Sequence, residues 1–211
     1  MFLGDPEQLI HPVQVMGFLI NKLKSLALFI AKDNHFLLRL SGVLIALLIF
    51  TLSFTTGFLI EQLCLQKGIG ASILIICIAS SISSKSLIDG MSKVLNLIRG
   101  CNSEEKLINA RNQLRKIVGR DVENLSKKEI LRAIAETGSE NSVDGIFAPI
   151  FWIFIGAISW NFSLSIPGPL AFAWAFKSSS TMDSMLGYKR GELQWLGTAS
   201  AYLDDWLNNL K

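Results

Sequence analysis

Hydrophobic stretches without any charged side chain divide this chain. The first covers residues 40–60, and its 21 residues would form a helix about 32 Å long, enough to cross the hydrocarbon core of a bilayer. The second covers residues 68–84, and its 17 residues would reach only about 26 Å, so we expect it to span barely or with local thinning of the bilayer. The short polar link between the two favours a tight antiparallel hairpin.

The third uncharged stretch, residues 145–176, is interrupted by Pro149, Asn161 and the cluster Pro167-Gly168-Pro169. One straight helix of this length would overshoot a bilayer, and two full crossings would need more residues than the interruptions leave. Two interpretations remain. The stretch is either one crossing plus a surface segment, or a re-entrant hairpin whose irregular backbone is covered by neighbouring helices.

The segment before the first stretch has the pattern of an amphipathic helix over residues 12–30, with Pro12 in its first turn. Its apolar side consists of Val13, Met16, Leu19, Ile20, Leu23 and Leu26. Lys22, Lys24 and Lys32 are placed to reach lipid headgroups. Because Asp5, Glu7 and His11 precede any apolar run, we do not expect a signal peptide at the start.

Residues 85–144 have a different pattern, with 11 Lys and Arg against 9 acidic residues. Leu107, Ala110, Leu114 and Ile117 recur at helical spacing, and Ser126 and Glu129 form a capping box that opens a further helix. This segment is therefore expected to be a small helical domain. Basic residues also precede the first stretch, so both regions are predicted to be cytoplasmic.

Composition supports a membrane protein, because 50% of the 211 residues are hydrophobic and only 18% are charged. The net charge of +3 is too small for a nucleic-acid-binding protein. Cys64, Cys77 and Cys101 have no metal-type spacing, so we expect neither a zinc site nor a disulfide scaffold.

These patterns predict an all-α, polytopic membrane protein with a helical cytoplasmic loop domain and a re-entrant segment. A single membrane-embedded domain over residues 1–211 would have five parts. They are an N-terminal motif with the amphipathic helix (1–39), a membrane helical hairpin (40–84), a cytoplasmic helical segment (85–144), a re-entrant or third membrane segment (145–176), and a polar motif segment (177–211).

The densest polar cluster contains Glu136, Glu140 and Asp144, which are four residues apart. If one helix runs through them, three carboxylates share a face and repel one another, so a cation such as Mg²⁺ is expected between them. The alternative is a solvated helix end in which Gly138 interrupts the stack.

A second polar cluster lies in residues 178–190 and is followed by a helical segment in which Asp204 and Asn208 share a face. The residues around His35 do not form a pattern that would supply it with a catalytic or metal-binding partner, and we expect it at the membrane interface. The chain contains no phosphate-binding loop, nucleophile elbow or zinc-protease motif.

The order of these polar clusters resembles that of one family, the adenosylcobinamide-phosphate synthases of cobalamin biosynthesis (the CobD/CbiB proteins). The matching stretches are Gly4-Asp5-Pro6 with His11-Pro12-Val13, Ala110-Arg111 with Ile117 to Asp121, Glu136-Thr137 with Glu140 to Gly145, Ala148-Pro149 with Phe151-Trp152, Thr181 to Lys189, and Ala199 to Asp205 with Leu207-Asn208. Two features depart from the family. Gly138-Ser139 replaces a bulkier pair, and the chain stops at Lys211 where family members continue, so we expect a short member or a fragment.

The resemblance implies an ATP-dependent amide ligation between an aminopropanol, free or as its O-phosphate, and a carboxylate of adenosylcobyric acid. A carboxylate is a poor electrophile, so ATP is expected to convert it to an acyl phosphate before the amine attacks. The resemblance implies three sets of site residues. The first set, Glu140, Asp144 and Asp183, would bind Mg²⁺. The second set, Arg111, Arg120 and Lys189, would face phosphate. In the third set, Glu136 or Asp205 would orient or deprotonate the amine. Asn141 and Asn208 are expected to contribute to binding the nucleotide.

Because ATP is cytoplasmic, the resemblance also implies that Asp144 and Lys189 both reach the cytoplasmic face of the cell (inner) membrane. Residues 145–176 would then enter and leave on the same side. The expected partners are the corrinoid, the aminopropanol or its phosphate, membrane lipid and other corrinoid-pathway membrane enzymes, but not nucleic acid.

The alternative function is a non-catalytic helical membrane partner or transporter subunit. That role predicts carboxylates in the middle of the spans, whereas the acidic residues of this chain lie at the edges of the three stretches.

Overall fold

The computed structural model describes residues 12–32, 34–66, 70–82, 84–99, 104–118, 121–188 and 191–209, without the side chains of residues 84–87 and 140. Every regular element in these ranges is helical, as the sequence predicts. The chain forms two compact units. The first unit comprises residues Met1–Ile82 and Ala148–Lys211, and the second comprises Ser83–Phe147.

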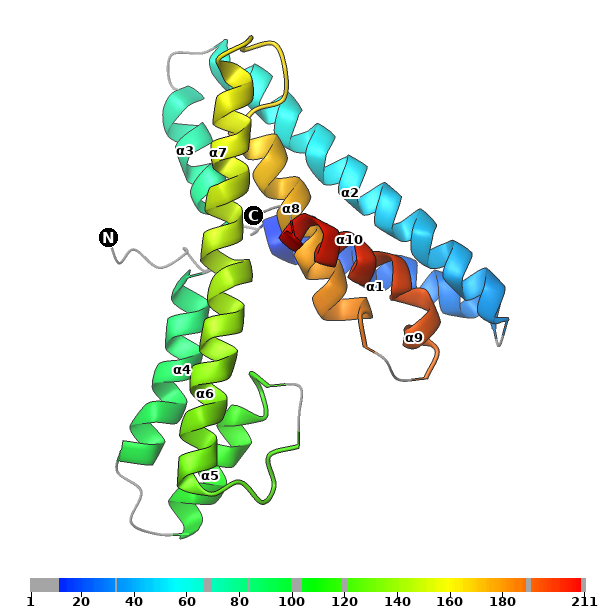
Figure 1. Ribbon diagram of the computed structural model, residues 1–211. Helices are drawn as coiled ribbons and strands as arrows, with labels where there is room; N and C mark the ends of the chain where they lie inside the picture. The colour runs from blue at the N-terminus through cyan, green and yellow to red at the C-terminus, as the bar shows by residue number, and fades with distance from the viewer. Residues whose placement is uncertain are drawn as a thin grey trace. The chain divides into compact units, whose positions relative to one another are not determined.

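The first unit contains seven helices in its described parts (Figure 1): α1 (Pro12–Ala31), α2 (His35–Leu65), α3 (Gly70–Ala79), α7 (Ala148–Trp160), α8 (Pro169–Leu186), α9 (Leu193–Leu196) and α10 (Thr198–Asn209). Helix α2 contains the whole first uncharged stretch, and α1 has nearly the bounds of the predicted amphipathic helix. The predicted apolar side is wrong at Leu26, which is 54% exposed, whereas the next residue, Ala27, is buried.

Helices α2 and α8 run antiparallel, as two close contacts show. A Cβ added at Gly57 would lie 2.9 Å from the Cα of Ala171 near the start of α8, and one at Gly42 would collide with the carbonyl of Leu196 in α9. Between these points, buried side chains of α1, α2, α8 and α9 form one hydrophobic cluster, which includes Ile20, Ile45, Ile49, Met182, Leu186 and Leu196.

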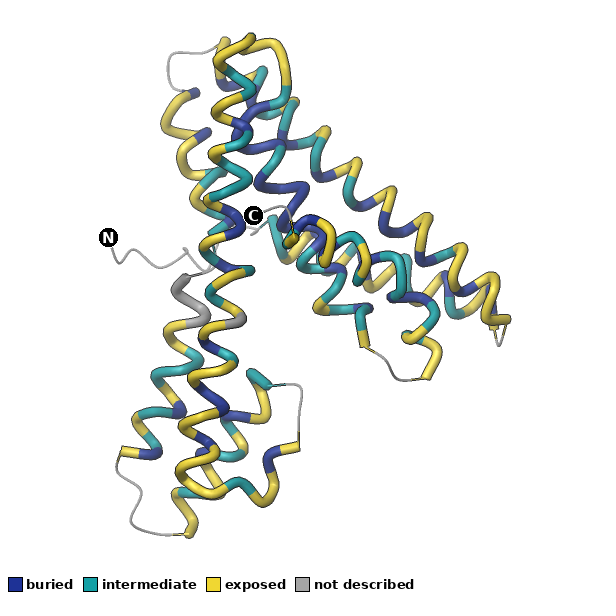
Figure 2. The backbone as a smooth tube through the Cα atoms, in the orientation of Figure 1, coloured by how far each residue is buried: buried dark blue, intermediate teal, exposed yellow. Residues whose placement is uncertain are grey.

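Three helical runs in the described residues are long and apolar enough to cross a membrane: Pro12–Ala31, His35–Leu65 and Lys127–Trp160. Much of the apolar surface of α2 is exposed in the isolated chain (Figure 2), including Leu44, Leu47, Leu48, Leu52, Leu59 and Leu63. An exposed apolar surface of this size on a long helix is what lipid contact requires. The structure therefore has the architecture of an all-α membrane protein.

The second uncharged stretch forms a shorter helix than the sequence predicts. Helix α3 has only 10 residues, about 15 Å, or half of a hydrocarbon core. Beyond it, the backbone tightens, since Ser81 and Ile82 donate to carbonyls three residues back. The hydroxyls of Ser80 and Ser81 also bond to the carbonyls of Cys77 and Ile78, each at 2.6 Å, which favours a turn over continued helix.

The third uncharged stretch forms a helical hairpin, and the re-entry of this hairpin into the membrane stays a prediction. Helix α7 leads into a loop over residues 161–168, and α8 returns beside it. At the open end of the hairpin, Ala148 and Phe176 belong to one buried cluster. At its tip, the hydroxyl of Ser159 bonds to the carbonyls of Gly156 and Pro167, and the indole of Trp160 donates to the carbonyl of Ile166 at 3.2 Å.

The tip of the hairpin is fastened to the C-terminal end of α2 by a buried carboxylate. Glu61 is fully buried, and its Oε2 accepts from the N–H of Gly168 at 2.8 Å. Its Oε1 accepts from the N–H groups of Leu170 and Ala171 at 2.6 and 3.2 Å. A carboxylate at a helix N-terminus satisfies N–H groups that have no partner inside the helix and complements the helix dipole. Gly168, the N-cap residue of α8, has no side chain that would do this.

The second unit consists of α4 (Ser84–Arg99), α5 (Glu104–Leu114), α6 (Lys127–Ser142) and the π-helical turn η1 (Val143–Phe147). Ala110 and Leu114 are buried in its core with Ile130 and Ile134, and Leu107 and Ile117 pack against them. The predicted capping box is present, because the Glu129 carboxylate accepts from the Ser126 N–H at 2.7 Å and the Glu129 N–H donates to the Ser126 hydroxyl at 3.4 Å.

The π-helical turn has a cause in the sequence. Pro149 cannot donate to the carbonyl four residues earlier, and its ring would clash with that carbonyl in a regular α-helix. The wider turn directly before Pro149 relieves this clash while the chain stays helical into α7. The proline that seemed to interrupt a helix thus produces a local change of helix type.

Candidate functional site

The predicted site residues are divided between the two units. Glu136, Asn141, Asp144 and Arg111 belong to the second unit, and Asp183, Asp205 and Asn208 to the first. Arg120, Lys189 and the N-terminal motif Gly4-Asp5-Pro6 with His11 lie outside the described residues, as does the side chain of Glu140.

Helix α6 is continuous through positions 136 and 140 of the predicted carboxylate face. The helix runs through Gly138, which does not interrupt it. Gly138 instead faces Met91 of α4, whose side chain occupies the space that a Cβ at 138 would need. Glu136 lies two residues from both Ile134 and Gly138, hence about 200° around the helix from this packed face. Its Oε1 accepts from Arg132 Nε at 2.7 Å.

Asp144 and Asn141 lie at the end of this helix. Asn141 is exposed, and Asp144 is half-buried within η1. Because a π turn holds more residues than an α turn, Asp144 does not continue the face at an interval of one α-turn. Short π segments occur frequently at functional sites.

Arg111 is mostly buried and is bound within the second unit. Its Nε donates to the carbonyl of Leu125 at 2.8 Å, and its Nη1 lies 3.4 Å from Glu104 Oε1. These contacts join α5 to the segment before α6. A guanidinium has five N–H donors, so the contacts account for only part of its capacity.

The first unit contains polar groups deep in an apolar surround. Lys177 on α8 and Asp204 on α10 are only 8% and 7% exposed. Ser179 is fully buried, and its hydroxyl has no partner among the described residues. Phe50, from the middle of α2, packs on the cluster that contains Phe176 and Leu207. Phe176 directly precedes Lys177, and Leu207 lies three residues after Asp204. Charged groups at such depth are costly and mark functional sites in membrane proteins.

The pair of aspartates on α10 has two different environments. Asp204 is buried and its Oδ2 accepts from Asn208 Nδ2 at 2.8 Å, whereas Asp205 is exposed and lines a pocket. The sequence motifs predict Asp205 and Asn208 as site residues but not Asp204. Helical spacing alone showed that Asp204 and Asn208 share a face, and burial shows that this face is internal.

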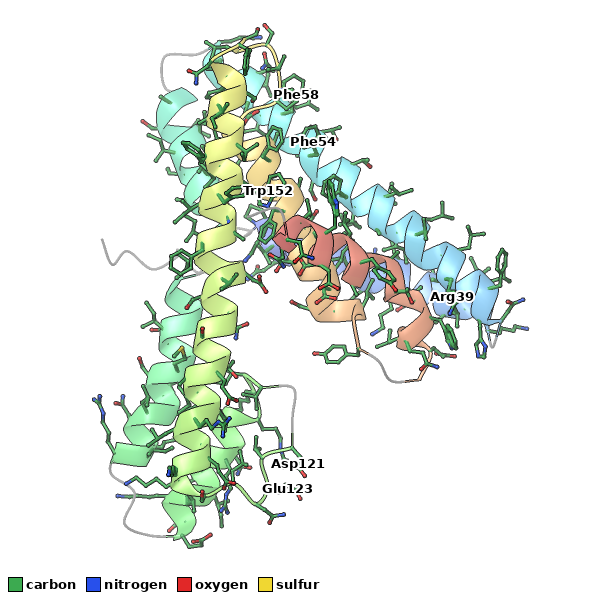
Figure 3. All side chains as sticks on the ribbon, in the orientation of Figure 1. Arg39, Phe54, Phe58, Asp121, Glu123 and Trp152 are labelled. Atoms are coloured by element: carbon green, nitrogen blue, oxygen red, sulfur yellow. The ribbon has the colours of Figure 1, made fainter. Side chains whose placement is uncertain are left out.

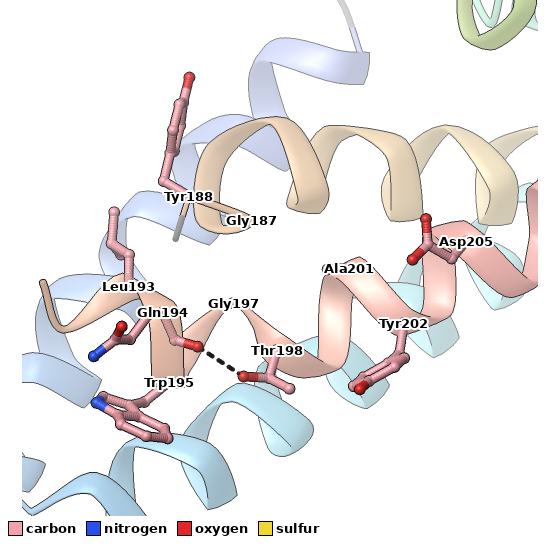
Figure 4. Close-up of a pocket in the computed structure, with 10 residues that line it drawn as sticks. All are labelled: Gly187, Tyr188, Leu193, Gln194, Trp195, Gly197, Thr198, Ala201, Tyr202 and Asp205. Carbon is pink, nitrogen blue, oxygen red and sulfur yellow. Dashed lines mark hydrogen bonds between the residues drawn. The ribbon is translucent and has the colours of Figure 1, made fainter. Parts of the chain in front are cut away.

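The pocket lies where α8 ends and α9 and α10 follow (Figure 4), with a volume of about 390 Å³. Its lining combines three aromatic residues, Tyr188, Trp195 and Tyr202, with Asp205. The small residues Gly187, Gly197 and Ala201 also line it. Such a mixture of aromatic walls and a few polar groups is typical of small-molecule sites.

Asp183 lies one turn before the pocket residue Gly187. Its Oδ1 is so close to Gly187 that a Cβ there would overlap it, and the Gly187 N–H donates to the Asp183 carbonyl at 2.7 Å. The structure therefore brings Asp183 to the pocket edge, and Asp205 and Asn208 to one helix beside it.

Among the side chains that the structure describes, no three of His, Cys, Asp and Glu lie close enough together to hold a metal ion. Magnesium bound through phosphates needs only one or two protein carboxylates. Magnesium binding by Glu140, Asp144 and Asp183 therefore stays a prediction.

His35, for which the sequence showed no partner, stacks on Trp195 with ring centroids 4.8 Å apart. Arg39, one turn further along α2, lies 4.3 Å from the centre of a Trp195 ring. The contacts join the start of α2 to α9 and hold one wall of the pocket. Trp195 lies 160 positions after His35 and 156 positions after Arg39, so the sequence carries no local signal for this arrangement.

Comparison with known proteins identifies the family. Residues 1–210 match the family model described as CobD/Cbib protein. The chain belongs to the CobD/CbiB family. The CobD/CbiB resemblance seen in the polar clusters is therefore confirmed over nearly the whole chain.

Three curated CobD/CbiB relatives show the extent of the similarity. "Cobalamin biosynthesis protein CobD" of Synechocystis sp. is 37% identical over 207 residues, covering 97% of this chain and 58% of the relative. The protein of the same name from Leptospira interrogans is 33% identical, covering 100% and 61%. "Cobalamin biosynthesis protein CbiB" of Salmonella typhi is 32% identical, covering 99% and 60%. The chain thus spans about three fifths of the length of these relatives, and no solved structure matches it.

Proposed function

We propose that this CobD/CbiB chain acts in cobalamin biosynthesis at the cytoplasmic face of the inner membrane. It would join an aminopropanol, or its O-phosphate, to adenosylcobyric acid by ATP-dependent amide formation. The family and the names of its relatives support the pathway. The reaction type rests on the resemblance of the polar clusters.

The observation that carries the proposal is the polar site in the first unit. Lys177 and Asp204 are buried inside an apolar helical unit, and Asp205, the residue after Asp204 on α10, lines the pocket. A unit that only packed against lipid or a partner would gain nothing from such costly groups. Amide ligation needs them, because it brings together a carboxylate, an ammonium and phosphates.

In the proposed reaction, an oxygen of the corrinoid carboxylate attacks the terminal phosphorus of ATP, and ADP leaves. The amine nitrogen then attacks the acyl carbon, phosphate leaves, and the amine loses a proton. Asp205 or Glu136 would orient the ammonium and accept this proton. Arg111, Arg120 and Lys189 would face the phosphates, with Asn141 and Asn208 beside the nucleotide. Mg²⁺, held by Glu140, Asp144 and Asp183, would shield phosphate charge.

A transporter or partner subunit is less well supported. That role predicts carboxylates that face a pathway within the membrane. Glu61, at the end of α2, instead uses both oxygens to bind backbone N–H groups.

The test is an assay of the purified 211-residue protein with ATP, adenosylcobyric acid and aminopropanol. ATP consumption is expected only when both other substrates are present, with one amide product formed per ATP. Asp144→Ala should abolish product while the protein still inserts into the membrane, and Asp89→Ala, at an exposed acid of the same unit, should keep activity. ATP consumption that ignores the two substrates would refute the proposal.

A further inference from the structure

The tip of the α7–α8 hairpin, residues 161–168, presents large apolar side chains on its outer surface. Phe162, Leu164 and Ile166 are 83%, 54% and 36% exposed, and Phe162 has the largest exposed fraction among the large hydrophobic side chains that the structure describes. Single exposed apolar residues are common on protein surfaces, so these side chains alone do not identify what covers the tip. The backbone of the tip supplies the second observation.

The carbonyl groups of the tip are bonded to polar side chains of the neighbouring helices. Three carbonyl oxygens accept from side chains outside the loop: that of Leu164 from Gln62, that of Ile166 from Trp160, and that of Pro167 from Ser159. The bond from Gln62 Nε2 is 2.8 Å long and comes from α2, whereas the other two donors belong to α7. These acceptors are therefore satisfied without water, although they lie outside any helix.

The N–H groups of the tip are bonded within the protein as well. Gly168 donates to Glu61 Oε2 at 2.8 Å, and Ser165 donates to the Ser163 hydroxyl at 3.1 Å. Three further N–H groups donate to carbonyls three residues back, those of Asn161, Phe162 and Ile166. Pro167 has no N–H to satisfy.

This hydrogen bonding is what a loop inside a membrane requires. The backbone groups of an ordinary surface loop can bond to water. Hydrocarbon offers no such partner, and irregular backbone is tolerated at that depth only where the protein itself bonds to it. A loop whose backbone is bonded inward and whose apolar side chains are exposed therefore fits lipid better than water.

The contacts with α2 place the tip along the membrane helix. Glu61 and Gln62, which hold the tip, follow directly after the uncharged stretch 40–60, which is about 32 Å long. Before them in α2, Phe54 lies edge-on to Phe172 of α8 with ring centroids 5.6 Å apart, and Phe172 stacks on Trp152 of α7 at 6.3 Å (Figure 3). The hairpin thus lies along the uncharged part of α2, and its tip is level with the end of that part.

We propose that the hairpin tip is a lipid anchor: Phe162 and Leu164 insert among the acyl chains of the leaflet that holds the end of α2, and the loop does not emerge into water. The apolar surface of α2 continues to this level, because Leu59 and Leu63 on its last turns are each 59% exposed. No ionisable side chain occurs between positions 145 and 176. The tip therefore extends one apolar surface whose partner is phospholipid acyl chains.

The experiment measures which medium surrounds the tip in a bilayer. Phe162→Cys and Leu164→Cys are made in the full chain after its native cysteines are replaced by alanine. Each is labelled with bimane in detergent and reconstituted into vesicles of phosphatidylcholine and phosphatidylglycerol. Gln66→Cys is the matched control, because Gln66 is exposed at the same end of α2. The fluorescence is quenched either by iodide in the water or by spin-labelled phosphatidylcholine in the bilayer.

The two quenchers should act in opposite orders. Iodide should quench the labels at 162 and 164 at least about fivefold less than the label at 66, and the spin-labelled lipid should quench them at least about twofold more. Equal quenching by iodide at the three positions would place the tip in water and overturn the inference. Labels at 162 and 164 that neither quencher reaches would mean that protein covers the tip, for example a second copy of this chain, and would overturn it as well.

A measurement on the unsubstituted protein does not depend on how the variants fold. A lipid-soluble carbene reagent, activated by light in the same vesicles, should modify the peptide that contains residues 161–166. No modification there, while the exposed leucines of α2 are modified, would contradict lipid contact. Because neither measurement uses ATP or a corrinoid, a negative result here leaves the proposed function standing, and a failed activity assay leaves the lipid anchor standing.

Discussion

Replacing Glu61 tests how strongly α2 holds the α7–α8 hairpin. Glu61→Ala removes three hydrogen bonds to backbone N–H groups and leaves the donors of Gly168, Leu170 and Ala171 buried without their acceptor. Each unsatisfied buried donor costs about 1–3 kcal/mol, but water will reach part of the cavity, so we expect a loss of about 3–5 kcal/mol in the free energy of unfolding.

Two further variants separate the charge from the contacts. Glu61→Gln keeps an oxygen for Leu170 and Ala171 but puts an NH₂ group against the N–H of Gly168, so a loss of about 1–3 kcal/mol is expected. Gln62→Ala is the matched control. It removes one bond, from Nε2 to the carbonyl of Leu164 at 2.8 Å, and should cost about 1 kcal/mol or less.

The assay is reversible unfolding of the purified protein in one detergent, followed by the fluorescence of its tryptophans, with Trp160 at the hairpin tip as a local reporter. The order of stability should be wild type, Gln62→Ala, Glu61→Gln, Glu61→Ala. A loss below about 1 kcal/mol for Glu61→Ala, no larger than that of its neighbour, would show that the three N–H groups do not depend on the carboxylate, and the reasoning would be refuted.

Three other predictions concern packing, capping and topology. Gly42→Ala should destabilise the protein by about 2–4 kcal/mol, because the new Cβ would meet the Leu196 backbone. In the control Gly17→Ala, the nearest contact of the new Cβ is Met185 Sδ at 3.6 Å, so stability should change by less than about 0.5 kcal/mol. Equal effects of the two variants in thermal unfolding would contradict this. Ser126→Ala should weaken the start of α6 by about 1 kcal/mol, seen as faster hydrogen exchange of the first-turn amides, and unchanged exchange would mean that the capping box does not contribute. In a chain without its native cysteines, a cysteine at Tyr188 should escape an impermeant thiol reagent in intact cells while one at Gln66 reacts; labelling at 188 would exclude the cytoplasmic assignment.

The sequence predicted the helices well where the signal was local. The uncharged stretch 40–60, the capping box at Ser126 and the helical spacing that begins at Leu107 all depend on residues close in sequence. The first two are present in the structure, and the third holds as far as Leu114, where α5 ends, while Ile117 lies in the turn that follows. The end of α3 was missed because an apolar composition does not reveal where serine hydroxyls bond to the backbone.

The site was only partly predictable for the same reason. Motifs selected Asp205 and Asn208, but burial, which depends on how α8 and α10 pack, reveals Asp204 and Lys177. Glu61 appeared to be a polar link residue because the N–H groups it binds lie 107 to 110 positions later. No periodicity within one segment carries that information.

The π-helical turn breaks the regular residue count of the helical run Lys127–Trp160. Five residues, Val143–Phe147, occupy this turn, and a π insertion adds about one residue, or about 100° of rotation, relative to a continuous α-helix. Within α7, the apolar residues Ile150, Phe154 and Ile158 recur every four positions and are all exposed, so the repeat of α7 itself defines its apolar outer side. A helical wheel for this membrane segment should therefore begin at Ala148, after the turn, and not at Lys127.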